Sequence, residues 1–147
     1  MIAELRRQFE LAWALTDLHL TALAEADFRW EPAEVCWTVR QDATGRWRAD
    51  FAEVEPDPVP VPTIAWLTWH IDYWWSAAIA AIQGLPLRSP DDVTWPGDGA
   101  AAVERVRTLA RRWREALAGW MFSVSASLRR SRGVRRPDAP SRTRCCG

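Results

Sequence analysis

The first 25 residues repeat apolar side chains at the spacing of an α-helix. Apolar and small residues recur every three or four positions over residues 2–25, which predicts one long helix with a buried stripe. The positions expected to be buried are Ile2, Leu5, Phe9, Ala12, Trp13, Thr16, Leu20 and Leu23. Leu11, Leu15 and Leu18 widen the apolar surface, as is typical of a helix inside a bundle.

Two further helices are predicted at residues 63–83 and 99–120. The first of these begins after Thr63, a favourable N-cap residue, and ends at Gly84. Two neighbouring apolar stripes predict that it is contacted on two sides; they are Ile64, Leu67, Ile71, Trp74 and Ala78, and Trp66, Trp69, His70, Tyr73 and Ala77. The last helix follows Asp98, and we expect its arginines to lie mostly on a solvated face.

The segment between the first two long helices has a different pattern. Apolar and polar residues alternate in "CWTVR" and "RWRADF", and "QDATG" lies between them. This predicts a short β-hairpin in which Gly45 takes the positive φ of the turn. The following "EVEPDPVPVP" has four prolines in seven residues, which predicts a stiff, extended linker.

Composition limits the classes of function. The 147 residues suit one domain, and residues 1–120 have a net charge of −6, whereas residues 121–147 have a net charge of +6. An acidic body is a poor nucleic-acid binder. No apolar run reaches the ~20 residues that cross a bilayer, and no signal peptide is apparent, so we expect a cytoplasmic protein without a membrane partner.

The three cysteines, Cys36, Cys145 and Cys146, do not have the spacing of a zinc knuckle or a disulfide framework. We expect Cys36 to be a small buried apolar residue.

The order of motifs resembles the DinB-like superfamily, and most closely its actinobacterial branch. The resemblance rests on "FRWEPAEVCWTVR", "PTIAWLTWHIDYWW" and "VTWPG", and it covers residues 1 to about 120. It implies an all-α fold, an up-down-down-up four-helix bundle. Many members of this superfamily hold a divalent metal with three histidines, and some are transferases or isomerases that depend on mycothiol, bacillithiol or glutathione. His70 matches the histidine of the second helix in that pattern.

The fourth helix of that pattern has no counterpart after Trp120. The chain continues as "MFSVSASLRRSRGVRRPDAPSRTRCCG", without an HxxxH pair. We therefore expect residues 1–120 to form the bundle, with the fourth helix missing or degenerate, and residues 121–147 to form a disordered basic tail. A frameshift or truncation in a G+C-rich gene would produce such a segment; a natural disordered tail is the rival explanation.

His70 is the candidate metal ligand, for zinc, nickel or a similar divalent ion. A catalytic zinc normally has three protein ligands, and the only other histidine, His19, is expected at the surface. His70 is otherwise a partly buried histidine hydrogen-bonded among aromatic residues. The rings of Trp66, Trp69, Tyr73 and Trp74 either line a pocket for an apolar or thiol-bearing molecule or form core.

Three functions remain open from the sequence. The first is a binding or structural bundle of the DinB family without a complete metal site. The second is a metal- and thiol-dependent transferase or isomerase that uses His70. The third is a module that binds a partner or forms a homodimer through the groove left by the missing helix, because exposed apolar grooves mark association sites.

Overall fold

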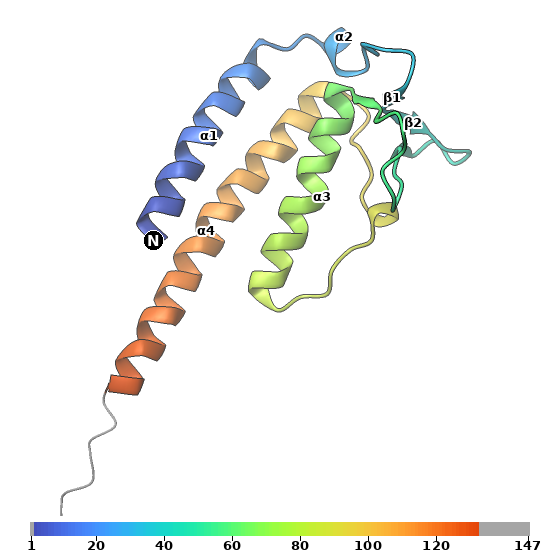
Figure 1. Cartoon of the computed structure of the whole chain (residues 1–147). Helices are drawn as coiled ribbons and strands as arrows, with labels where there is room; N and C mark the ends of the chain where they lie inside the picture. The colour runs from blue at the N-terminus through green and yellow to red at the C-terminus, as the bar shows by residue number, and fades with distance from the viewer. Residues whose placement is uncertain (1, 133–147) are drawn as a thin grey trace, which may run out of the picture.

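The computed structural model describes the backbone of residues 2–132 and the side chains of residues 3–120. Three long helices make up most of it (Figure 1): α1 (Ile2–Ala22), α3 (Ile64–Gln83) and α4 (Gly99–Arg132). Short elements lie between them, namely α2 (Glu25–Phe28), β1 (Cys36–Trp37), β2 (Val39–Gln41), β3 (Trp47–Ala49), β4 (Val61–Pro62) and the 3-10 turn η1 (Pro90–Asp92). The predicted mostly helical fold is confirmed.

The long helices run in the up-down-down order that the resemblance implies (Figure 1). On α1, Glu10 pairs with Arg114 and Asp17 pairs with Arg107, so α1 and α4 are antiparallel. α3 and α4 form the most extensive helix contact. They are parallel, because Asp72 near the middle of α3 meets Arg105 in the second turn of α4, whereas the end of α3 lies beside residues 115–120 of α4.

The predicted boundaries of α3 are confirmed by its caps. The Thr63 hydroxyl accepts the backbone N–H of Trp66 at 3.3 Å, and Gly84 ends the helix with a φ of 68°. The first helix ends at Ala22, three residues before the predicted end. The chain is extended at Ala24, whose N–H donates to the Asp27 carboxylate at 2.7 Å and so starts the short α2.

α4 is longer than the sequence pattern predicted. It begins after Asp98 as expected but continues to Arg132, whereas we expected the helix to end at residue 120. The proposed division of the chain at residue 120 therefore falls inside one helix. The remainder of the predicted basic tail, residues 133–147, lies outside the described residues. The frameshift or truncation suggested by the sequence remains a hypothesis about the gene.

The predicted hairpin is confirmed, and the linker holds an unpredicted strand. β2 and β3 are antiparallel, with Gly45 in the turn at a φ of 80°. The proline-rich segment ends in β4, which pairs in parallel with β1; the backbone N–H of Thr63 donates to the Trp37 carbonyl at 2.9 Å. Cys36 in β1 is only partly buried, because it lies at the edge of this two-stranded sheet.

The core lies between α3, α4 and the segment that precedes α4. Trp95 inserts there and donates its Nε1–H to the Thr68 hydroxyl at 3.0 Å, and Val93 beside it is 1 % exposed. The buried side of α3 consists of Ala65, Thr68, Trp69, Asp72 and Ile79. The predicted stripes were therefore partly wrong: Leu67 and Trp74 are 38 % and 54 % exposed, because the described chain covers α3 on one side.

The α4 arginines are mostly exposed, as expected, but three of them also have partners on other helices. Arg105, Arg107 and Arg114 each pair with a carboxylate of another helix, and Arg114 also lies 5.4 Å from the ring centroid of Phe9. Among residues 2–132, no helix is long and apolar enough to cross a membrane.

Candidate functional site

The site that the sequence singled out lies on the N-terminal half of α3. His70 is partly exposed, and its imidazole stacks on the ring of Trp66 with centroids 4.6 Å apart and planes 23° apart. The ring of Trp74 meets the imidazole edge-on at 6.1 Å. Because the resemblance implies a histidine at this position, the geometry around His70 decides what it can do.

Aromatic packing fixes the Trp66 ring from two sides. Its other stacking partner is Trp37 of β1 at 5.6 Å, and the ring of Trp69 lies tilted against it at 5.9 Å. The Trp66 Nε1–H donates to the backbone carbonyl of Asp50 at 2.7 Å. The hairpin segment therefore holds the ring against which His70 packs. Neither the hydrogen bond to Asp50 nor the stacking on Trp37 has a local sequence signal, since the partners lie 16 and 29 positions away.

The four rings of the predicted pocket fall into a buried part and an exposed part. Trp69 is 2 % exposed and donates its Nε1–H to the Val93 carbonyl at 2.7 Å, so it is a core residue. Tyr73 stacks on Trp69 at 5.8 Å with planes 5° apart. Trp74, next to Tyr73 at 5.1 Å, is 54 % exposed. Trp74 is thus the most exposed of the four rings, whereas Trp66 and Tyr73 are partly buried.

The contacts found for the His70 imidazole among the described side chains are aromatic rather than hydrogen bonds. Partial burial lowers the pKa of His70 below its ordinary value, because a charged imidazolium loses hydration there. At neutral pH the ring is therefore neutral, which is the form that binds metals or accepts a proton.

Three carboxylates of α1 and α3 and the other histidine have their side chains away from His70. Asp72 points to α4 and pairs with Arg105, as its position about 200° around the helix from His70 predicts. Glu10 and Asp17 pair with arginines of α4. His19 is exposed on α1, as expected.

A three-ligand metal centre does not fit the described residues. Among the described side chains, those of residues 3–120, no group of three or more His, Cys, Asp or Glu residues could hold a metal ion. His70 faces aromatic rings, which offer no lone pair to a metal. The described side chains thus provide one candidate ligand where a catalytic zinc normally has three.

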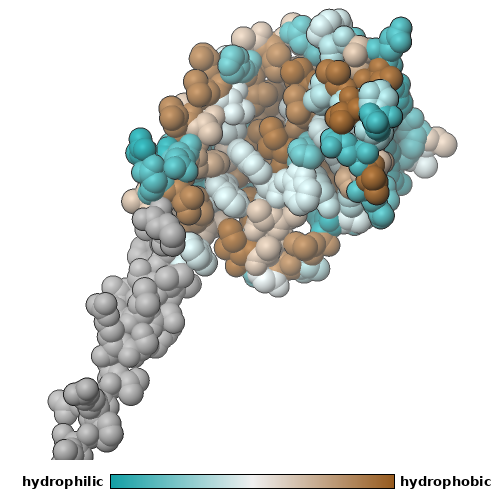
Figure 2. All heavy atoms as spheres, viewed as in Figure 1, coloured by the Kyte–Doolittle hydropathy of each residue, from teal (hydrophilic) through white to brown (hydrophobic). Residues whose placement is uncertain are grey.

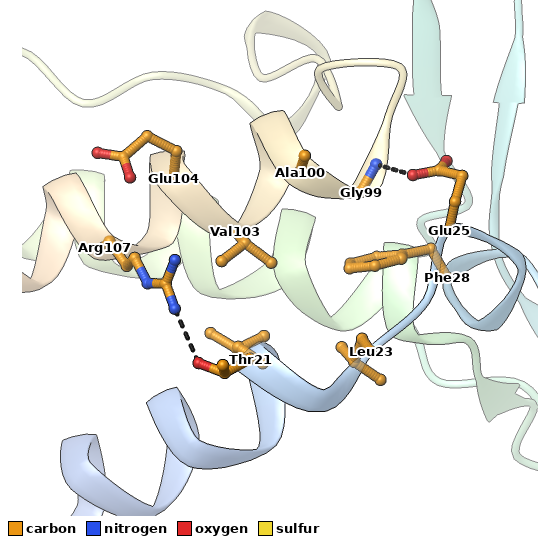
Figure 3. A pocket seen from close by; sticks show the side chains of 10 residues that line it. Thr21, Leu23, Glu25, Phe28, Gly99, Ala100, Val103, Glu104 and Arg107 are labelled. Carbon is orange, nitrogen blue, oxygen red and sulfur yellow. Dashed lines mark hydrogen bonds between the residues drawn. The ribbon is translucent and has the colours of Figure 1, made fainter.

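A second candidate site, which the sequence did not predict, lies where α1, α2 and α4 meet (Figure 3). This cavity of about 370 Å³ is lined by apolar residues, among them Leu23, Phe28 and Val103, and by polar residues that include Glu25. The Glu25 carboxylate, at its edge, accepts the backbone N–H of Gly99 at 2.7 Å. The contact joins residues 74 positions apart, and no local pattern signals such a contact.

Comparison with known proteins identifies the family of this chain. The family model described as "DinB superfamily" matches residues 8–137, so the match continues beyond residue 120, where the motif resemblance ended. No curated protein and no solved structure matched the chain. Because the match covers most of the sequence and the helices have the order expected for such a bundle, the chain belongs to the DinB superfamily.

Proposed function

We propose that this protein is a binding or structural member of the DinB superfamily without a complete metal site. Its ligand is a small apolar or thiol-bearing molecule that lies on the aromatic surface formed by Trp66, His70, Tyr73 and Trp74. The observation that supports this most directly is the stacking of the His70 imidazole on Trp66, beside the exposed ring of Trp74.

The chemistry of this surface suits a flat apolar molecule or a thiol. Aromatic rings favour offset or edge-on partners, and sulfur makes favourable contacts with aromatic rings. The neutral imidazole of His70 can accept the proton of a thiol S–H group. Trp66 is fixed by Trp37 and Asp50, so binding would require little reorganisation on that side.

A ligand titration with matched probes tests this proposal. The full chain is titrated with benzyl mercaptan and with toluene, and the shift of the thermal unfolding midpoint is measured. Ligands that bind only the folded state raise the midpoint. We expect both probes to stabilise the protein, benzyl mercaptan more than toluene, and Trp74→Ala to reduce both shifts.

Trp120→Ala is the matched control, because Trp120 is an exposed tryptophan (42 %) on α4. The proposal is wrong if neither probe stabilises the native chain, or if Trp120→Ala reduces the shifts as much as Trp74→Ala does.

A second candidate function is a divalent-metal- and thiol-dependent transferase or isomerase. Three properties of His70 favour it: the side chain is partly exposed, its pKa is lowered, and it occupies the position that the resemblance assigns to a metal ligand. This candidate requires thiol-dependent turnover that depends on added zinc or nickel. It is tested by following consumption of a thiol substrate by the native chain and by His70→Ala; equal rates would exclude it.

A further inference from the structure

A small cavity lies between the C-terminal half of α3, the loop that follows it and α4. Its volume is about 340 Å³, which is within the range of sites that hold small molecules. Ser76 forms part of its α3 side and lies about 120° around the helix from His70. The cavity is therefore separate from the aromatic surface around His70.

Two arginines that line this cavity differ from most others in the chain. Most of the twelve arginines in residues 1–120 pair with Asp or Glu. Arg88 of the loop and Arg112 of α4 have no carboxylate partner among the described side chains, and the described residues that line the cavity include no Asp or Glu. Two positive charges are thus concentrated at one cavity, although residues 1–120 have a net charge of −6.

The sequence of α3 explains why Arg112 differs from Arg105. The two arginines are seven residues apart and therefore lie on the same side of α4. Arg105 pairs with Asp72 of α3, and the helices are parallel, so Arg112 meets α3 about two turns after Asp72. The residues that line the cavity there include Ala80 and Gln83, which carry no charge. The chain itself thus neutralises Arg105, whereas it leaves the charge of Arg112 for another group to neutralise.

Hydrogen bonds hold the walls of this cavity in place. Arg88 donates from Nη2 to the backbone carbonyl of Asp92 at 2.5 Å, and its other N–H groups remain for a ligand. The carboxylate of Asp92 accepts the N–H and the hydroxyl of Ser89, at 3.0 and 2.9 Å. The N–H of Leu85 donates to the Ala80 carbonyl at 2.9 Å, which fixes the start of the loop. Binding a ligand here would require little reorganisation of the backbone.

We propose that this cavity binds a small organic anion, a carboxylate or a phosphate monoester with a short aliphatic body. The planar fork of N–H donors on a guanidinium group matches the oxygen atoms of either head group, and such charged hydrogen bonds are the strong ones. Arg88 and Arg112 supply these forks, and the side-chain amide of Gln83 supplies a further N–H donor. The ligand thereby neutralises the charges that the described chain leaves without a carboxylate.

Apolar surface beside the arginines accommodates the aliphatic body. Ala80, Leu85 and Pro86 line the cavity together with the polar groups. Figure 2 shows hydrophobic residues at the lower end of the molecule, where α3 ends and the loop begins (Figure 1). Among the residues of this region, Ile82, Leu85 and Leu87 are 39 %, 54 % and 65 % exposed. A free inorganic ion would leave this surface uncovered, so an organic anion fits the cavity better.

An NMR titration of the full chain with matched probes tests this proposal. Butyrate, butyl phosphate and butan-1-ol have the same aliphatic body and differ in the head group. The shifts of backbone amide signals around the cavity, at constant ionic strength, give the dissociation constants. We expect saturable shifts there with an anion and none with the alcohol, because only the anions pair with guanidinium groups. Tighter binding of butyrate identifies a carboxylate ligand, and tighter binding of butyl phosphate identifies a phosphate monoester.

Arginine variants test the two residues that carry the proposal. Arg112→Gln and Arg88→Gln should each raise the dissociation constant of the anion by about tenfold or more, because each removes a charged hydrogen-bonding group. Arg111→Gln is the matched control: it removes the same charge from the neighbouring position of α4, where Arg111 is exposed, pairs with Glu104 and does not line the cavity. It should leave the dissociation constant unchanged.

Three results would overturn the proposal: no saturable shift around the cavity with either anion, equally tight binding of butan-1-ol there, or equal weakening by Arg111→Gln and Arg112→Gln. Trp74→Ala separates this site from the aromatic surface around His70. Anion binding at the cavity should persist in that variant, and its loss would likewise contradict the proposal. Failure of ligand binding at His70 leaves the expected result at this cavity unchanged.

Discussion

At the scale of single residues, Asp72 shows how a polar side chain is held inside this bundle. Its side chain is 4 % exposed and pairs with Arg105 of α4, while its Oδ1 atom is buried without a hydrogen-bond partner among the described residues. A buried carboxylate with one partner depends strongly on that partner, because the charge would otherwise be left in a poorly solvating interior. The pair therefore fixes α3 against α4 at this level.

Removing Arg105 should destabilise the protein more than removing a surface arginine. Arg105→Ala leaves the Asp72 carboxylate buried without its partner, and we expect the free energy of unfolding to fall by about 2–3 kcal/mol. The loss should be smaller than for a fully buried pair, because Arg105 is partly exposed. Arg111→Ala removes the exposed pair with Glu104 and should cost less than about 1 kcal/mol. Urea unfolding measures the free energy of unfolding of both variants. Equal losses would show that the Asp72–Arg105 pair contributes no more to stability than the exposed Glu104–Arg111 pair does.

The pair of Glu10 and Arg114 predicts a dependence of stability on pH. Two hydrogen bonds from Arg114, at 2.8 and 2.7 Å, hold the pKa of Glu10 below its usual 4.5. The unfolded chain takes up this proton at higher pH than the folded chain does, so the stabilisation is present above about pH 4.5 and is lost as pH falls through the folded pKa.

Glu10→Gln should therefore lower stability at pH 7 by about 0.5–1 kcal/mol, since the pair is partly exposed, and should reduce the loss of stability between pH 5 and pH 3. Urea unfolding at each pH measures this. Glu115→Gln, at an exposed residue of α4, is the control; an identical pH profile for Glu10→Gln and the native chain would contradict the assignment.

At the scale of elements, α2 and the start of α4 meet at a glycine. A Cβ added at Gly99 would lie 2.3 Å from Cε2 of Phe28, which is itself 2 % exposed. Phe28 and the Glu25 carboxylate therefore approach the backbone of α4 more closely than any other residue at position 99 would allow. This junction positions the cavity of Figure 3.

Gly99→Ala should destabilise the protein by about 1–3 kcal/mol, the usual cost of overpacking a filled site. Gly119→Ala should stabilise it by about 0.5–1 kcal/mol, because nothing lies within 4 Å of a Cβ added there and alanine favours a helix interior. Thermal unfolding compares the stability of the two variants. A Gly99→Ala variant as stable as the native chain would contradict the prediction and would mean that Phe28 can move away from position 99.

The sequence predicted those elements that are specified by local signals. Thr63 and Gly84 mark the ends of α3, and Gly45 marks the hairpin turn, because caps and turns depend on neighbouring residues. Burial was predicted less well. Thr68 and Asp72 are buried because their polar groups meet Trp95 and Arg105, and periodicity of apolar residues cannot show a partner 27 or 33 positions away.

The candidate site was predicted in part for the same reason. The cluster of aromatic residues around His70 was visible in the sequence, but its division into a buried Trp69 and an exposed Trp74 depends on which side of α3 is covered. The predicted end of the last helix at residue 120 was wrong because arginine and serine were taken as signs of a tail; arginine is a good helix former.

At the scale of the whole molecule, three helices in up-down-down order form a bundle in which the described residues leave one side of α3 uncovered. His70 lies next to the exposed Leu67 and Trp74 on that side. We propose that His70 belongs to an aromatic binding surface and not to a metal centre. The described neighbours of its imidazole are aromatic rings, and the carboxylate of Asp72 pairs with Arg105 instead.

Isothermal titration of Zn²⁺ into the full chain tests that claim most directly, with His70→Ala and His19→Ala measured in parallel. The account predicts that His70→Ala leaves the zinc isotherm unchanged apart from weak surface binding that all three proteins share. A tight site with one zinc per chain that disappears in His70→Ala and persists in His19→Ala would contradict it.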